Sequence, residues 1–597
     1  MSDLDVDVLI VGGGAAGLTV SALLGSYGVD TLLVNAWPHT SILPKAHILN
    51  QHTMEILAAI GAADEVYERA TPPEMTRYTG IFAGFAGPHE DYGRLITKTE
   101  SWGAAGDDVD YVAASEHRLA NLPQIRLEPI IRARAEALAG KDRVRFGHEM
   151  LSFTQDDEGV EAVILDRETG NEYRVRARYL LGCDGGRTVR PQLGIELDNL
   201  GPEKSQAARI VSIYMTADLS KWATEPEALL RSYYLPDLGR TIGLLAMGPD
   251  HWGPESEEWV VHQFFPAEEE ATTDDEAAVV KMREALGIGD VEVTVHAITR
   301  WWFEGVLARE FRKGRAFLLG DAAHRHPPTG GLGLNSAVQD AYNIAWKLAA
   351  VLQGHAGDEL LDTYEAERRA VTGRNVRRAL ENAANAPKLR AAMGVEYVPD
   401  PEGNWKTLRD YWADTPEGKR RRREVLAAVT EQSMEFRAHN TEYGYTYEST
   451  AVLPDGEPAP EPIDEIRVYR PSTRPGHPLP HAWLLDDDGD LVPIASLLGP
   501  GRFLLIAGEK GQAWQEAARK IAAEHGLPLD AVTIGHGEGD YLDPRCTWLR
   551  HRDIDADGAI LVRPDRFVAW RSRGASADAV SELSGAVFSV LGRAPHA

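Results

Sequence analysis

The chain has only two cysteines, Cys183 and Cys546, among its 597 residues. Two cysteines far apart exclude a disulfide framework and a cysteine-rich metal centre, and they are typical of a reducing compartment. Basic residues are also scarce, because 62 Lys and Arg stand against 91 Asp and Glu, a net charge of −29. A nucleic acid or an anionic membrane would be repelled by that field. We therefore expect a cytoplasmic protein with neither as a partner.

A long uninterrupted hydrophobic run is missing too. Residues 8–29 carry no charged side chain and are numerous enough to cross a bilayer, but six glycines interrupt them. The flanking residues are Asp7 and Asp30, so no basic region of a signal peptide precedes the run. The apolar residues divide into a short β-branched stretch and a helical pattern, which favours a strand followed by a helix.

This N-terminal segment has the form of a dinucleotide-binding βαβ unit. A buried strand is predicted at 6–11, a helix follows the glycine-rich loop, and a second strand is predicted at 31–34. In such a loop the first glycine permits a tight turn, the second lets a pyrophosphate approach, and the third lets helix and strand pack closely. Glycine-rich turns can also serve packing alone. The expected cofactor contacts are Gly12, Gly14, Ala15, Ala16 and Gly17.

One position departs from the usual pattern. The second strand of such units commonly ends in an acid that binds the adenosine ribose, and this chain has Asn35 there. An amide can still hydrogen-bond a hydroxyl group, so we keep Asn35 as a predicted cofactor contact.

Two further strands end in glycine and aspartate. Residues 175–181 lead to Asp184, and residues 316–319 lead to Gly320 and Asp321. A loop then precedes a long amphipathic helix over 337–352, so a second helix N-terminus faces a loop that tolerates an anion. Each aspartate could instead accept turn or cap hydrogen bonds. His324 and His326 have no partner at metal-ligand spacing, so no metal is expected.

Together these segments resemble the class A flavin monooxygenases of the p-hydroxybenzoate hydroxylase fold. The resemblance covers roughly the first two thirds of the chain and includes the run 361–369. Residues 43–57 and 121–129 are most similar to the branch containing phenol 2-monooxygenase and 2,4-dichlorophenol 6-monooxygenase. The implied architecture is α/β, with a Rossmann-like FAD-binding domain, an interleaved β-sheet substrate domain and a C-terminal thioredoxin-like domain.

The resemblance also assigns cofactor contacts. Asp321 would bind the ribityl chain of FAD, and Asp184 would serve both FAD and the nicotinamide cofactor. Backbone N–H groups of Leu334 and Asn335 would meet the pyrimidine end of the flavin, where the helix dipole favours the negative charge of the reduced ring. Lys45 stands where the family has an arginine. The other implied contacts are Gln124, Gly320, Pro328, Gly330 and Gly333.

The implied reaction is hydroxylation of a phenolic or hydroxypyridine ring, ortho to the hydroxyl group. NAD(P)H reduces FAD, O₂ adds to it, and the C4a-hydroperoxyflavin transfers oxygen to the small aromatic substrate. A phenol of pKa near 10 costs about 4 kcal/mol to ionise at pH 7, so a positioned base helps. His47 falls where phenol hydroxylase places its base, although a purely structural histidine is an open alternative.

The substrate chamber should be lined by residues of the central strands. Aromatic residues on strands often serve core packing instead, so the prediction concerns the group more than any member. The candidates are Tyr233, Tyr234, His262, Phe264, Trp302 and, from the flavin loop, Pro327.

The predicted domains follow from these segments. The FAD-binding domain comprises 1–205 and 305–385, the substrate domain 206–304 with part of 75–115, and a helical linker segment 386–465. Residues 466–597 form the thioredoxin-like domain, in which Gly508-Glu509-Lys510-Gly511 replaces a redox C-x-x-C motif. Such a domain should be redox-silent and support structure or a homo-oligomer.

Two other functions stay open. The same flavin could carry out epoxidation or a Baeyer–Villiger insertion on a natural product, which needs no phenolate. The fold could also serve as a flavin-binding sensor without turnover.

Overall fold

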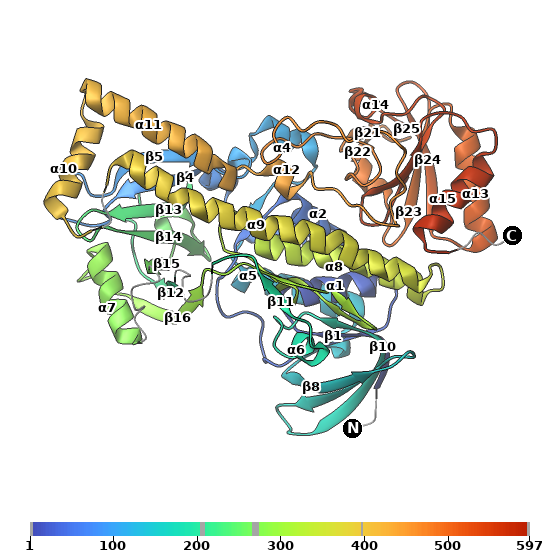
Figure 1. Cartoon of the computed structure of the whole chain (residues 1–597), viewed down its shortest axis with the longest axis horizontal. Coiled ribbons are helices and arrows are strands. Elements are labelled where there is room, and N and C mark those ends of the chain that lie inside the picture. The colour runs from blue at the N-terminus through green and yellow to red at the C-terminus, as the bar shows by residue number, and fades with distance from the viewer. Residues whose placement is uncertain (1–3, 203–208, 266–273, 396–397, 594–597) are drawn as a thin grey trace.

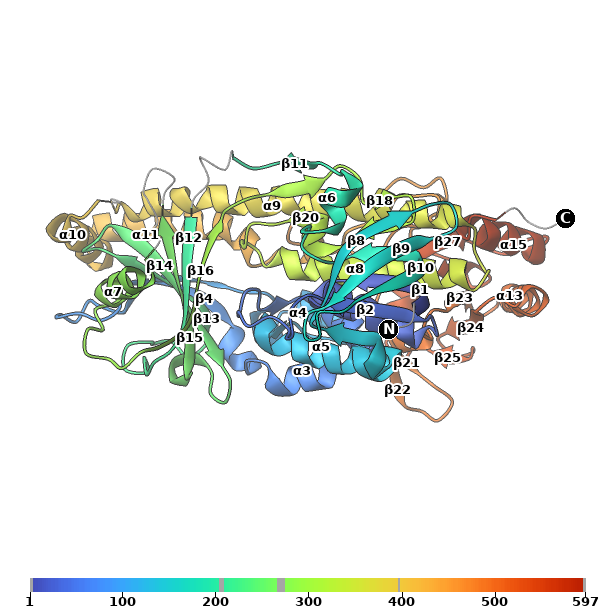
Figure 2. The ribbon, with the colours of Figure 1, turned by 90° about the horizontal axis from the view of Figure 1, so that it is seen from below.

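The computed structural model describes residues 4–202, 209–265, 274–395 and 398–593. It contains three large sheets that succeed one another along the long axis of the molecule (Figures 1 and 2). The helix α9 (Asp362–Met393) runs beside the central sheet and the substrate-domain sheet, and so links the domains that contain them (Figure 1). The predicted fold class is confirmed.

The central sheet has the order β18-β19-β10-β1-β2-β7, with β9 and β8 attached to β10. Its middle strand β1 is parallel to both neighbours, and Val8 to Ile10 are fully buried, as a strand covered on both faces requires. Helices α1 (Ala15–Ser26), α5 (Gln124–Ala139) and α8 (Leu332–Leu352) pack beside it. The strands are β1 (Leu4–Val11), β2 (Thr31–Asn35), β7 (Val144–Phe146), β8 (His148–Gln155), β9 (Val160–Asp166), β10 (Glu172–Gly182), β18 (Arg312–Lys313) and β19 (Ala316–Leu318).

The uncharged segment 8–29 is therefore a strand and a helix of this domain. Within the described residues, no helix combines the length and the apolar character needed to cross a bilayer.

The substrate-domain sheet has the order β16-β12-β15-β14-β13-β4-β5. One face is covered by α7 (Asp275–Leu286), and the other carries a cluster that reaches Ile125 of α5 in the FAD-binding domain. The sheet is thus closed on one side and meets the cofactor domain on the other. Its strands are β4 (Tyr78–Ala83), β5 (Arg94–Glu100), β12 (Arg209–Thr216), β13 (Ala228–Leu235), β14 (Arg240–Gly248), β15 (Glu258–Phe265) and β16 (Thr294–Trp302).

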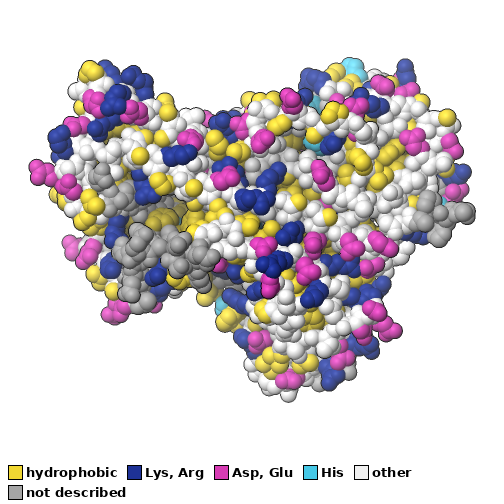
Figure 3. All heavy atoms as spheres, viewed as in Figure 1, with side chains coloured by type: hydrophobic (Ala, Val, Ile, Leu, Met, Phe, Trp, Pro, Cys, Tyr) yellow, Lys and Arg dark blue, Asp and Glu magenta, His cyan; other side chains and the backbone are white. Residues whose placement is uncertain are grey.

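The segment that precedes the C-terminal sheet is helical, with α9 followed by α10 (Pro401–Trp412), α11 (Pro416–Gln432) and α12 (His439–Glu442). The boundary expected at 385 lies inside α9, which continues past Pro387 because Leu389 and Met393 pack against the substrate-domain sheet. The basic run 419–423 lies on α11, where Arg420 pairs with Glu417 and Glu424. Figure 3 shows charges of both signs mixed there.

The C-terminal sheet has the order β22-β21-β25-β24-β23-β26-β27, flanked by α13 (Gln512–His525) and α15 (Ala579–Val590). The segment 508–511 begins at the last residue of β23 and has the sequence Gly-Glu-Lys-Gly, at the place where a redox domain would carry C-x-x-C. The strands are β21 (Trp483–Leu485), β22 (Leu491–Pro493), β23 (Phe503–Gly508), β24 (Leu529–Gly535), β25 (Tyr541–Leu542), β26 (Ala559–Val562) and β27 (Val568–Ser572).

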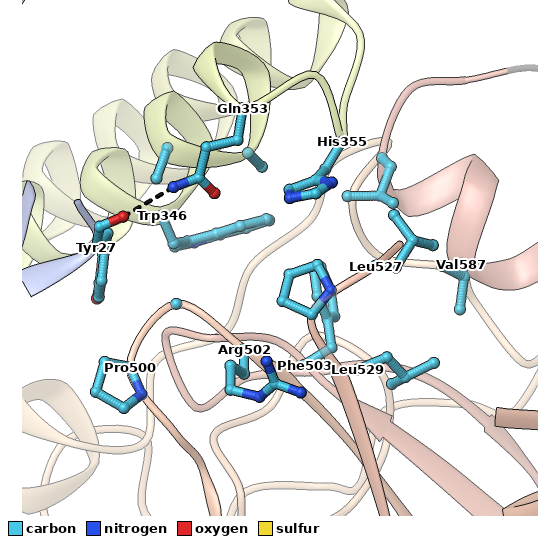
Figure 4. A pocket seen from close by; sticks show the side chains of 15 residues that line it. Tyr27, Trp346, Gln353, His355, Pro500, Arg502, Phe503, Leu527, Leu529 and Val587 are labelled. Carbon is cyan, nitrogen blue, oxygen red and sulfur yellow. Dashed lines mark hydrogen bonds between the residues drawn. The ribbon is translucent and has the colours of Figure 1, made fainter. Parts of the chain in front are cut away.

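A buried ion network fastens this C-terminal domain to the cofactor domain. Arg563 donates to both carboxylate oxygens of Glu367, at 2.6 and 2.9 Å, and Lys347 donates to the same carboxylate at 2.7 Å. Beside the network, a cavity of about 140 Å³ lies between α8 and the C-terminal sheet, lined by Trp346, Phe503 and other side chains (Figure 4). None of the predicted site residues lines this cavity.

Candidate active site

The glycine-rich loop between β1 and α1 is closed on one side and open on the other. A Cβ on Gly12 would lie 2.2 Å from the Cys183 carbonyl oxygen, and one on Gly17 would lie 2.0 Å from the Gly12 oxygen. At Gly14 the nearest atom would be Glu128 Oε1, at 3.6 Å. The loop therefore packs tightly against β10 while Gly14 leaves space for an anionic group, as a bound pyrophosphate requires.

Helix α1 begins at Ala15, and no acidic residue lies in its first turn. The unpaired N–H groups of this turn and the helix dipole suit a phosphate. Glu128 of α5 lies beside them, where it accepts hydrogen bonds from Ser41 N at 2.6 Å and Gln124 Nε2 at 2.6 Å. Burial raises the pKa of Glu128, and its hydrogen bonds with Gln124 and Ser41, together with the charge of exposed Lys45, partly offset that shift.

Asn35 and Asp184 have their polar atoms engaged within the chain. Asn35 Oδ1 accepts from Gly13 N at 3.0 Å, and Asn35 Nδ2 donates to the Trp37 oxygen at 2.9 Å. Asp184 accepts from the N–H groups of Gly186, Thr188 and Val189 at 2.6–2.9 Å. Both residues therefore shape the loops that border the cofactor site. Their direct contact with a cofactor stays a prediction.

Asp321 is different, because it is exposed in the short turn Gly320–Ala322 and makes no hydrogen bond to a described residue. Its carboxylate is thus available to hydroxyl groups such as those of a ribityl chain. A fully buried carboxylate lies behind this turn. Asp340 accepts from Gly320 N at 3.1 Å, His324 Nε2 at 2.7 Å and Arg368 Nε at 2.8 Å. His324 consequently belongs to this structural network.

Helix α8 begins at Leu332, after Gly330 and Gly331 with φ of 87° and 65°. The N–H groups of Gly333 and Leu334 lie in the first turn and have no intrahelical acceptor, so they suit the negative pyrimidine end of a reduced flavin. Pro327 is buried and Pro328 is exposed in the preceding loop.

The Asn335 side chain ties this helix start to the segment that follows His47. It accepts from Asn50 N at 3.0 Å and donates to the oxygens of Ile48 at 3.0 Å and Gly331 at 2.6 Å. The segment that contains His47, the predicted base, is thereby hydrogen-bonded to the start of α8 and the loop before it.

His47 is held in a defined tautomer. Its Nδ1 lies 2.5 Å from Asn121 Oδ1, and Asn121 Nδ2 donates to Thr71 Oγ1 at 2.6 Å. An amide oxygen only accepts hydrogen bonds, so Nδ1 of His47 carries the proton and Nε2 is left as an acceptor. Burial lowers the pKa of His47, which keeps the ring neutral near pH 7. Asn121 is positioned by the pairing of β6 (Ala120–Asn121) with β3 (Ile48–Leu49).

The structure corrects two of the predicted substrate residues, because neighbouring residues on a strand point to opposite faces. Tyr233 packs with Phe82 and Phe85 on the face covered by α7, away from the cofactor domain. Trp302 also lies on the other face from His262, with Arg209 over its ring at 4.7 Å. Its neighbour Trp301 is the residue that points toward His262.

The other candidates stay on the face that meets the FAD-binding domain. His262 is half-buried and Phe264, two residues further on, is 41% exposed. Tyr234 is buried at the far end of the sheet, against Leu389 and Met393 of α9.

Several residues of the site were not predicted from the sequence. Asn121 lies 74 positions from His47, and Asp340 lies 20 positions from Gly320, at spacings that match no motif. Glu435 is another, since Gly330 N–H donates to its carboxylate and burial raises its pKa to about 7. Asn121 lies in the segment 121–129 and Asp340 in the predicted helix 337–352, but neither pattern singled out these side chains.

Comparisons with known proteins agree with this geometry. A family model described as FAD binding domain matches residues 5–379, and a model described as aromatic-ring hydroxylase, C-terminal, matches residues 472–594. Phenol 2-monooxygenase of Pseudomonas sp. (strain EST1001) is 36% identical, covering 97% of this chain and 92% of the relative. Tetracenomycin A2 monooxygenase-dioxygenase of Streptomyces glaucescens is 34% identical, covering 99% and 98%.

A solved structure is similar over its whole length. The flavin-dependent monooxygenase PieE, in complex with FAD and substrate, has a TM-score of 0.90 and 38% identity, with full coverage of both chains. The predicted resemblance is thereby confirmed.

Proposed function

Because the chain belongs to the FAD-dependent aromatic-ring monooxygenases, we propose that it hydroxylates a phenolic or hydroxypyridine ring, ortho to the hydroxyl group. The observation that carries this proposal is the bond between His47 Nδ1 and Asn121 Oδ1, which leaves Nε2 of a neutral imidazole to accept a proton. A relative named for phenol supports a substrate of that class.

The residues of this chain divide the work between cofactor and substrate. When bound, FAD supplies the redox chemistry that connects NAD(P)H, O₂ and the ring. Gly14, the first turn of α1 and Asp321 would hold its phosphate and ribityl parts, and the start of α8 would face its ring system. His47 Nε2 takes the phenolic proton and so recovers part of the roughly 4 kcal/mol that ionisation costs at pH 7.

The replacement His47→Asn tests this role. We expect kcat/KM for a responsive phenol to fall about 10²- to 10⁴-fold at neutral pH. The loss should shrink as the pH approaches the pKa of the phenol, because the substrate then arrives already ionised. His39→Asn, at an exposed histidine of the same segment, is the matched control and should leave the pH profile unchanged. A His47→Asn loss of equal size at every pH would refute proton acceptance by His47.

The relative named for tetracenomycin favours a second candidate, in which the substrate is a polycyclic ketide. Epoxidation or Baeyer–Villiger oxidation of such a molecule requires no phenolate. His47→Asn should then change the rate by the same small factor throughout the pH range.

A further inference from the structure

His262 lies on the face of the substrate-domain sheet that meets the cofactor domain. It pairs across the sheet with Ser212 of β12 and Gly243 of β14. On the same face, Val260 and Tyr214 belong to the cluster that reaches Ile125, the residue after Gln124. His262 is also close enough to His47 for a proton on His47 to lower its pKa. Both rings therefore border the same region.

A chain of hydrogen bonds decides which nitrogen of His262 carries the proton. Trp301 Nε1 donates to Ser212 Oγ at 3.0 Å, and Ser212 Oγ lies 2.7 Å from His262 Nδ1. Ser212 is buried, and in the described part of the chain its hydroxyl proton has no acceptor other than His262 Nδ1. Because a buried hydroxyl proton without an acceptor is costly, Ser212 donates and Nδ1 accepts. The ring proton of neutral His262 is therefore on Nε2.

Nε2 of His262 makes no hydrogen bond to a described residue. The partner across the sheet is Gly243, which has no side chain to cover the ring; an added Cβ there would lie at contact distance, 3.6 Å from His262 Cβ and 3.7 Å from His262 Cδ2. Burial lowers the pKa of His262 to about 4, so the ring stays neutral in the range in which enzymes are assayed. His262 thus offers one fixed N–H donor.

We propose that His262 Nε2–H donates to a second acceptor atom of the substrate, so that preferred rings carry an oxygen or nitrogen acceptor besides the hydroxyl that faces His47. The two histidines are complementary, since His47 accepts at Nε2 and His262 donates at Nε2. A ring with a hydroxyl donor and a separate methoxy, nitro or carbonyl acceptor satisfies both, whereas phenol satisfies only one. This specificity rests on the proposed function.

The experiment compares His262→Leu, which removes the donor, with His262→Gln, which restores an N–H at a similar reach. Binding of phenol, 2-methoxyphenol and 2-hydroxyacetophenone is measured on the oxidised holoenzyme through the change in flavin absorbance, without turnover. We expect His262→Leu to weaken binding of the two substituted phenols about tenfold and binding of phenol less than twofold. His262→Gln should recover most of the lost affinity. These ratios should not change between pH 6 and 9, because His262 does not titrate there.

Ser212→Ala tests the hydrogen-bond chain that fixes the tautomer. Without the hydroxyl, the proton can move to Nδ1, so the same rings should bind more weakly although His262 is present. The double variant Ser212→Ala, His262→Leu should bind no more weakly than His262→Leu alone. The matched control is His251→Leu, an exposed histidine paired with Glu257, which should leave all three dissociation constants unchanged.

The outcomes distinguish a failure of the specificity proposal from a failure of the proposed function. If His262→Leu weakened binding of phenol and of the two substituted phenols equally, the specificity role would be overturned, because His262 would then serve the shared hydroxyl or the fold. Unchanged binding in every variant would overturn it as well. If wild-type enzyme converts no phenolic ring at all, the proposed function fails instead, whatever the binding ratios show.

Discussion

The cofactor side and the substrate side of this site depend on different parts of the protein. The cofactor side uses backbone: glycines at 12, 14 and 17, and the first turns of α1 and α8. The substrate side uses side chains linked across strands, as in His47 with Asn121 and His262 with Ser212. A backbone site tolerates almost no change at its glycines, whereas a side-chain site can be retuned one hydrogen bond at a time.

The largest expected effect contrasts two glycines of the same loop. Gly17→Ala places a Cβ 2.0 Å from the backbone oxygen of Gly12, so the loop must deform and FAD binding should be lost. Gly14→Ala meets nothing closer than 3.6 Å, so the apoprotein should fold normally and only FAD affinity should fall. Circular dichroism and flavin titration of both apoproteins check this. Equal loss of helical signal in the two variants would contradict a loop that is open at Gly14.

The next effect concerns the carboxylate behind the cofactor side. Asp340→Asn leaves Arg368 buried without its charged partner and should lower the free energy of unfolding by about 3–5 kcal/mol. Its neighbours hold the pKa of Asp340 below its usual value, so its stabilisation is present above the unfolded pKa and fades as pH falls through the folded one. The stability difference between wild type and variant, from urea unfolding, should therefore narrow in strong acid.

Asp362→Asn is the control for that prediction. Asp362 is exposed and pairs with Arg312, so its replacement should cost at most about 1 kcal/mol. A similar loss in both variants would mean that burial of the Asp340 network contributes nothing special.

The smallest effect concerns the substrate side. Asn121→Asp places a carboxylate 2.5 Å from His47 Nδ1, and this charge should raise the pKa of His47 by about one unit or more. Since protonated His47 cannot accept the phenolic proton, the acidic limb of kcat/KM should move to higher pH by the same amount. Asn171→Asp, at an exposed turn, should leave the limb in place. A limb that does not move in Asn121→Asp would assign it to another group.

The same contrast explains what could be predicted from sequence. Gly12, Gly14 and Gly17 act through backbone space, and their spacing alone indicated a loop that the structure shows. Tyr233 and Trp302 were misplaced because composition does not reveal which face of a strand points inward, and the sheet register decides that. Asn121 and Ser212 were missed because they act through partners 74 and 50 positions away.

The central claim is transfer of one oxygen atom from O₂ to a phenolic ring. The most direct measurement supplies isotopically labelled O₂ and NAD(P)H to the FAD-loaded enzyme and a phenol that stimulates reductant consumption, followed by mass spectrometry of the product. We predict a catechol-type product that carries one labelled oxygen next to the original hydroxyl group. Reductant consumption that yields only hydrogen peroxide from every phenolic ring, or a product whose new oxygen is unlabelled, would contradict the account.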